Sequence, residues 1–325
     1  MNELTSLRDL GEALDQELRG PSPQLRHKVL TGISRQPGRT RRAQRRSGLR
    51  WRLVITSGLA AALAAAILAA STIRLWGASP AASAQAADIL RRAADAARHQ
   101  PALTPNPSQF IYIKTIGRSA AIGDRNQITM QAELHEVWLS ADGTRNGLIR
   151  QQPRSPSNLS RPAGPWQNTV APPCSDTTGS GAVCQPQPGY PAGLPTSAGA
   201  MLAYLYRNSH GQNPPPVQAF ITAHDLIGVS YLRPAALAAL FGALEKLPGV
   251  TVAHHAVNAA GQQGVAVQQI YNGMSDQLIF NPRTYAVIGY REVVVSASAG
   301  LKVGTILYSA AILRLAVVNH AGQLP

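Results

Sequence analysis

The sequence is poor in acidic residues, aromatic residues and cysteine. Its 325 residues include 16 Asp and Glu against 30 Lys and Arg, which gives a formal net charge of +14. Such an excess suggests binding to nucleic acid, but single-strand binding also needs aromatic side chains interleaved with the basic ones. Aromatic residues make up only 5% of the chain, and the densest basic run contains one of them, Trp51. We therefore predict no nucleic-acid partner.

The positive charge is concentrated before an uncharged apolar segment. The run at 35–52 carries eight arginines, among them Arg41, Arg42, Arg45, Arg46, Arg50 and Arg52. Residues 53–73 then read LVITSGLAAALAAAILAASTI, without a charged side chain. Roughly 20 apolar residues at 1.5 Å per residue match a hydrocarbon core of about 30 Å. The sequence thus predicts a transmembrane helix at 53–75.

The arginines also predict the orientation of this helix, because an excess of Lys and Arg marks the cytoplasmic side. The chain is then a single-pass protein of the cell membrane, with residues 1–52 in the cytoplasm and residues 76–325 outside. Two alternatives stay open: a signal peptide cleaved near Ala82-Ser83-Ala84, and a buried helix of a soluble protein.

The cytoplasmic segment at 1–34 contains two short amphipathic patterns, followed by the arginine-rich linker at 35–52. Helically spaced apolar residues form the faces, which include Leu7, Leu14, Leu18, Leu25 and Val29. About 34 residues cannot bury a core of their own. The segment could dock on a cytoplasmic partner, lie on the membrane lipid, or stay unstructured and serve only topology.

The region outside the membrane predicts an α+β domain with one antiparallel sheet. We expect a helical stalk at 76–107, with a helix at 83–99, and then the domain at 108–325. Within it, strands begin with FIYIKTI at 110–116, and the Asp142-Gly143 turn indicates a hairpin. Helices are expected at 197–207, 219–231 and 235–247, and further strands between residue 250 and the C-terminus, with separate strands at 285–290 and 292–295.

A segment at 151–198, dense in Pro, Ser, Gly and Thr, is expected to be a loop. It contains both cysteines of the chain, Cys174 and Cys184. In an oxidising compartment outside the membrane, such a pair predicts a disulfide. A metal or redox site would need a C-x-x-C spacing or further ligands, which the segment lacks.

Motifs for catalysis, nucleotide binding and metal binding are missing, so we predict no enzyme activity, cofactor or metal. His254 and His255 are neighbours on an expected strand and should point to opposite faces. Asp225 is expected to cap a helix. Trp138 is expected in the core of the sheet, and a metal or acid–base site at Glu133, His135 and Glu136 is not expected.

A set of short segments, in a fixed order, resembles a family of uncharacterised actinobacterial single-pass membrane proteins, often encoded beside extracytoplasmic-function sigma factors. The segments are QFIY (109–112), WLSADG (138–143), LPT (194–196), LAYLYR (202–207), LPGV (247–250), GVAV (264–267), LIFNPRTY (278–285) and GQLP (322–325). The resemblance implies no catalytic residues. The external half is loosely similar to the half-barrel sheets of lipoprotein-carrier and envelope-stress-sensor domains, which hold acyl chains or a partner on an apolar face.

Three functions follow as hypotheses. The first is a membrane-anchored sensor or regulator that links external binding to a cytoplasmic partner such as a sigma factor. The second is an external binding or carrier module for an apolar envelope ligand. The third, a hydrolase using His224 or His254, is the least supported, because titratable groups are sparse.

Overall fold

The computed structural model describes residues 82–122, 127–173, 188–296 and 301–325, all within one compact unit. Its ten strands form one antiparallel sheet, so the predicted α+β class is confirmed. The strands follow the order β4 (Asn158–Pro162), β3 (Gly147–Ser155), β2 (Ile128–Ser140), β1 (Phe110–Ile122), β10 (Ile306–Val318), β9 (Val287–Val294), β8 (Met274–Phe280), β7 (Gln263–Tyr271) and β6 (Thr251–Val257), while β5 (Gln167–Ala171) pairs with β3.

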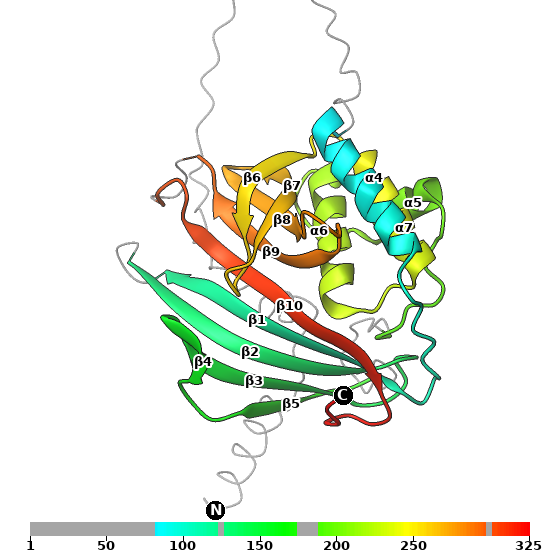
Figure 1. The fold of residues 1–325 in the computed structure, drawn as a ribbon, viewed down its shortest axis with the longest axis vertical. Coiled ribbons are helices and arrows are strands. Elements are labelled where there is room, and N and C mark those ends of the chain that lie inside the picture. The colour runs from blue at the N-terminus through cyan, green and yellow to red at the C-terminus, as the bar shows by residue number, and fades with distance from the viewer. Residues whose placement is uncertain (1–81, 123–126, 174–187, 297–300) are drawn as a thin grey trace, which may run out of the picture. The chain divides into compact units, whose positions relative to one another are not determined.

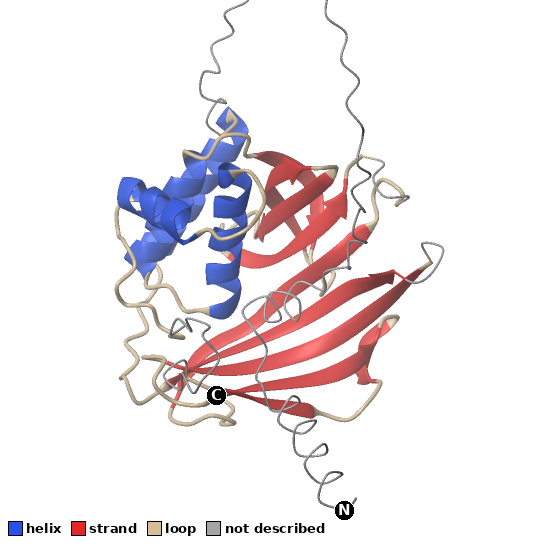
Figure 2. Cartoon of the chain, turned by 180° about the vertical axis from the view of Figure 1, so that it is seen from behind, coloured by secondary structure: helices blue, strands red, loops and turns tan. Residues whose placement is uncertain are grey.

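The helices of the described region pack against one face of the β6–β10 half of the sheet (Figures 1 and 2). They are α4 (Ala84–Arg98), α5 (Ala198–Asn208), α6 (Pro215–Val229) and α7 (Pro234–Glu245). The largest core lies between these helices and the sheet, where Phe241 of α7 meets Phe280 of β8 edge to face at 5.5 Å. We call this side of the sheet the helix face.

Helix α4 forms where its sequence predicts it. The Ser83 side chain accepts a hydrogen bond from the Ala86 N–H at 3.2 Å and so caps the helix. Its alanine-rich face is buried against α7, and the Ser83 N–H donates to the Val250 carbonyl at 2.8 Å. The chain therefore enters the domain through a helix that is part of the core.

Regular alternation places a second set of side chains on the opposite face, which we call the outer face. On β1, Ile111 and Ile113 pack on the helix face, whereas Tyr112 and Lys114 point to the outer face. The turn between β6 and β7 brings Ala259 onto the outer face, against Ile116 and Leu134, where Leu159 and Trp166 pack from the β4–β5 side. The middle of the outer face is thus covered.

Several element predictions need correction. The segment at 151–198 is not one loop, because it contains the end of β3, strands β4 and β5, and the first residue of α5. The strands expected at 285–290 and 292–295 are one strand, β9. Helix α6 begins at Pro215 rather than after the prolines, since the first helical turn needs no N–H donors and tolerates proline.

Other sequence predictions concern parts of the chain outside the described residues. They include the amphipathic faces at 1–34, the arginine run, the span at 53–75 and the Cys174–Cys184 disulfide. In the part of the chain that the structure describes, no helix has the length and apolar character needed to cross a membrane.

Candidate functional site

A row of charged side chains crosses four neighbouring strands on the outer face. The register places Arg314 of β10 opposite Lys114 of β1, Lys114 opposite Glu136 of β2, and Glu136 opposite Arg150 of β3. Residues directly opposite each other on antiparallel strands share a face and lie within reach of one another. Three cations and one carboxylate therefore meet in a single row.

Glu136 is the centre of this row, although only 2% of its surface is exposed. One carboxylate oxygen accepts the Tyr112 hydroxyl at 2.9 Å and lies 3.3 Å from the Lys114 Nζ. The other oxygen accepts the Arg150 Nε–H at 3.0 Å and also an Nη2–H of the same guanidinium. A buried carboxylate is tolerated when its oxygens are paired in this way.

Two tryptophans hold the Arg150 side chain in place. The guanidinium carbon lies 4.3 Å from the ring centroid of Trp166 and 5.4 Å from that of Trp138, distances at which a cation is attracted to an aromatic ring. Trp138 is fully buried, as predicted, and its indole N–H donates to the Gln323 carbonyl at 2.6 Å. We call Tyr112, Lys114, Glu136, Trp138, Arg150 and Trp166 the Arg150 cluster.

The cluster stabilises its residues in their ordinary ionisation states. Burial by itself would raise the pKa of Glu136, but hydrogen bonds from Arg150 and Tyr112 and the nearby charges outweigh it and lower the pKa below 4.5. Burial, together with the hydrogen bond to Glu136, raises the pKa of Tyr112. Neither group is tuned for proton transfer near neutral pH.

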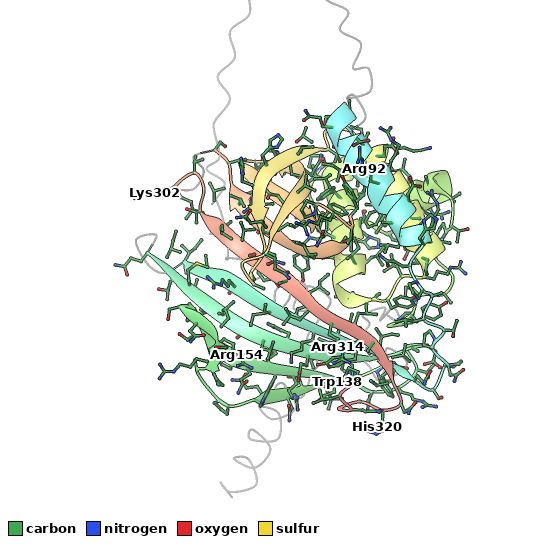
Figure 3. The ribbon with its side chains drawn as sticks, in the orientation of Figure 1. Arg92, Trp138, Arg154, Lys302, Arg314 and His320 are labelled. Atoms are coloured by element: carbon green, nitrogen blue, oxygen red, sulfur yellow. The ribbon has the colours of Figure 1, made fainter. Side chains whose placement is uncertain are left out.

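A second row of cations lies on the same face, four residues further along the strands. It contains Arg118 of β1, Arg154 of β3 and Arg291 of β9. Arg118 and Arg291 both lie opposite Ser309 of the intervening strand β10. Arg118 and Arg154 both lie opposite Ala132 of the intervening strand β2. At about 3.3 Å per residue, the two rows are roughly 13 Å apart. We call the six cations of both rows the outer basic face; Figure 3 labels Arg154 and Arg314 over this part of the sheet.

The second row has few acceptors. Among the described residues, the buried Nε atoms of Arg118 and Arg154 have no hydrogen-bond partner. Arg154 donates from Nη1 to the Ser160 carbonyl at 3.0 Å, and Arg291 donates from Nε to the Gln277 amide oxygen at 2.6 Å. On β1, β2, β3 and β10, Glu136 is the one acidic residue whose side chain points to this face. The outer basic face is therefore strongly positive.

The helix face carries a separate set of titratable side chains. The Glu133 carboxylate lies 3.2 Å from the His135 Nε2, and this hydrogen bond lowers the pKa of Glu133. The His224 ring meets Tyr290 edge to face at 4.0 Å, and burial raises the pKa of Tyr290 to about 12. Within the described residues, no three His, Cys, Asp or Glu side chains are grouped so that they could hold a metal ion.

Two smaller site predictions are corrected. His224 and Asp225 lie inside α6, so Asp225 does not cap a helix. His254 and His255 are both exposed at a bulge between Ala253 and Ala256, where His255 has a φ of 56°, so strict alternation does not apply to them.

The residues of the outer basic face were missed by sequence reasoning. Lys114, Arg150 and Arg314 lie on three different strands, and nothing in their sequence spacing indicates that they meet. The one usable signal was the predicted hairpin around Asp142-Gly143, whose register places Glu136 opposite Arg150. That register depends on the turn conformation, in which Gly143 has a φ of 77°.

Comparison with models of protein families and with curated proteins gives no match to this chain. Its function must therefore be inferred from the geometry of the site.

Proposed function

We propose that this protein is a non-enzymatic, membrane-anchored sensor or regulator of the cell envelope. In this proposal, the extracytoplasmic α+β domain binds a ligand on the outer basic face, and residues 1–34 contact a cytoplasmic partner, such as a sigma factor. The observation that carries it is the Arg150 cluster. A buried carboxylate and two tryptophans orient cations there, as a binding site requires.

The chemistry of the cluster favours binding over catalysis. A nucleophile or general base needs a pKa close to the working pH, or a neighbour that activates it. Glu136 is occupied by three donors, and its pKa is lowered. Tyr112 is fully buried, and its hydroxyl donates a hydrogen bond to Glu136. Charged, immobile donors of this kind recognise an anion rather than transform it.

The connection from the domain to the membrane is short in this proposal. The predicted span ends at residue 75 and α4 is capped by Ser83, so about eight residues connect them, a reach of roughly 26 Å. Helix α4 then packs on α7 in the core of the domain. A change of packing in the helical core would therefore reach the anchor through α4.

The test is a pull-down of cytoplasmic proteins on the segment 1–52. The matched control is the same segment with Leu7→Ser, Leu14→Ser and Leu18→Ser, which keeps all charges and removes the apolar face. We expect the unaltered segment to enrich a regulatory protein and the serine variant to lose it. Equal recovery on both segments, or none on either, would count against a regulatory role.

An extracytoplasmic carrier of an apolar ligand is the second candidate. It is favoured by Ile128 and Met130 on β2, which are 40% and 37% exposed at one end of the β1–β2 hairpin. In a carrier, the N-terminal segment would only set the orientation of the chain in the membrane. Deletion of residues 2–34 would then leave the phenotype of the cell unchanged, whereas the sensor hypothesis requires a loss of signalling.

A further inference from the structure

We propose that the outer basic face binds a phosphate ester, held by Lys114, Arg150 and Arg314. This inference rests on the proposed function, in which the face is the ligand site, and it names the ligand's chemistry. The three side chains come from β1, β3 and β10 and lie in one row of the sheet.

Arg150 provides the oriented donor of the site. Its Nε and Nη2 groups are engaged by Glu136, while its Nη1 group makes no hydrogen bond to any described residue. The nearby rings of Trp138 and Trp166 restrict the rotation of the guanidinium. An anion that meets this Nη1 group therefore loses little free energy to ordering of the arginine.

The local charge favours an anion. Lys114, Arg150 and Arg314 carry three positive charges against the single negative charge of Glu136, so the row is left with an excess of two. Arg314 is exposed and has no ion pair or hydrogen bond with any described residue. Lys114 is one-third exposed and contacts Glu136 with one of its three possible N–H bonds.

The number of cations favours a phosphate group over a carboxylate. A carboxylate presents two oxygens in one plane, whereas a phosphate monoester presents three charged oxygens in a tetrahedral arrangement. Three cations in one row supply more positive groups than the two oxygens of a carboxylate can use, and they match the three oxygens of the monoester in number. Trp166 is only half-buried, and its ring offers an apolar surface to the organic part of an ester, which inorganic phosphate lacks.

The experiment measures binding to the full-length chain in a maltoside detergent, which carries no phosphate. Glycerol 3-phosphate, inorganic phosphate and acetate are titrated by calorimetry at low ionic strength. Vesicles of phosphatidylcholine with and without phosphatidic acid, a lipid phosphate monoester, are tested separately by flotation with the chain. We expect glycerol 3-phosphate to bind more tightly than inorganic phosphate, and acetate to bind most weakly.

The deciding variant is Arg314→Gln, because this exposed side chain makes no hydrogen bond or ion pair with another described residue and its loss should leave the fold intact. We expect it to weaken glycerol 3-phosphate binding roughly tenfold, as for the loss of one charge-assisted hydrogen bond. Arg207→Gln, an exposed arginine at the end of α5, is the matched control and should change nothing. Circular dichroism of both variants checks that they remain folded.

Each outcome is informative. Binding of the free ester that depends on Arg314 supports a soluble phosphate ester, and binding only to the vesicles that contain phosphatidic acid, with the same dependence, supports a lipid headgroup. Equal affinity for acetate or for inorganic phosphate, no binding at all, or equal losses in Arg314→Gln and Arg207→Gln would overturn the inference. A positive pull-down combined with any of those results would leave the sensor proposal standing without this ligand.

Discussion

At the scale of single residues, Glu136 determines the arrangement of the outer basic face. Ion pairs that are buried contribute little net stability compared with apolar residues of the same size, yet removing one partner is costly because the others stay unpaired. Glu136 serves Tyr112, Lys114 and Arg150 together. Its main contribution is therefore the orientation of these side chains.

Replacement of Glu136 by glutamine should lower the free energy of unfolding by about 2–3 kcal/mol. The amide keeps the volume but removes the charge that compensates Lys114 and Arg150, which are themselves only partly exposed. Urea unfolding measures the change. Glu133→Gln on the same strand is the control, because that side chain is nearly half exposed and its pair should contribute less than about 1 kcal/mol. Equal losses in the two variants would contradict this role of Glu136.

The lowered pKa of Glu136 also predicts a dependence of stability on pH. A carboxyl group whose pKa is lower in the folded state stabilises the fold above its unfolded value, here near 4.5, and loses this contribution as the pH falls through the folded value. We expect the urea concentration at the unfolding midpoint to decrease as the pH is lowered below 5. In Glu136→Gln this decrease should be smaller. Parallel pH profiles for the two proteins would show that Glu136 is not the group responsible.

At the scale of elements, two glycines differ in the space that their surroundings leave for a side chain. Gly289 lies on β9, where an added Cβ would be 2.1 Å from the Ala310 carbonyl oxygen of the neighbouring strand. Gly199 lies in α5, and no atom lies within 4 Å of an added Cβ there. An added methyl group is therefore crowded at Gly289 and unhindered at Gly199.

Gly289→Ala should destabilise the domain by more than 1 kcal/mol, because the β9–β10 pair must shift to admit the methyl group. Gly199→Ala should stabilise it by up to about 1 kcal/mol, since alanine has the higher helix propensity. The thermal midpoints of the two variants, measured side by side, check this prediction. A destabilised Gly199→Ala variant, or an unchanged Gly289→Ala variant, would contradict the surroundings described for these two glycines.

Element boundaries were predictable where local chemistry determines them. Ser83 caps α4 at the expected place, and the Asp142-Gly143 turn joins β2 to β3. The strands at 158–162 and 167–171 were missed because their polar residues are mostly exposed at the edge of the sheet and show no apolar alternation. They form through pairing with β3, a contact that no local pattern encodes.

At the scale of the whole molecule, the described domain places its main apolar core on one face of the sheet and its rows of cations on the other. On the β6–β10 half, the helix face is covered by α4–α7 and forms the main apolar core. The outer face carries the cations of both rows and only small apolar clusters. A large core on one side supports the fold, so the other side is free to present charge.

The proposed topology makes a prediction for the full-length chain. Changing Arg41, Arg42, Arg45, Arg46, Arg50 and Arg52 to asparagine removes the charge that should hold the N-terminus in the cytoplasm. We expect the unaltered chain to expose residues 82–325 to protease added outside the cell and the variant to lose this uniform orientation. Replacement of six exposed arginines elsewhere should have no such effect. Full protection of the unaltered domain would refute the predicted topology.

The sequence by itself determined the α+β class of the domain, the positions of most helices and strands and the burial of Trp138, because these follow from local propensity and periodicity. It also supplied the predicted anchor and its orientation, which depend on an uncharged run and its arginine flank. Only the tertiary structure decided the outer basic face. Lys114, Glu136, Arg150 and Arg314 are brought together by strand register. Lys114 and Arg314 pair across strands although they are 200 residues apart in the chain, so their meeting depends on the whole sheet rather than on any local segment.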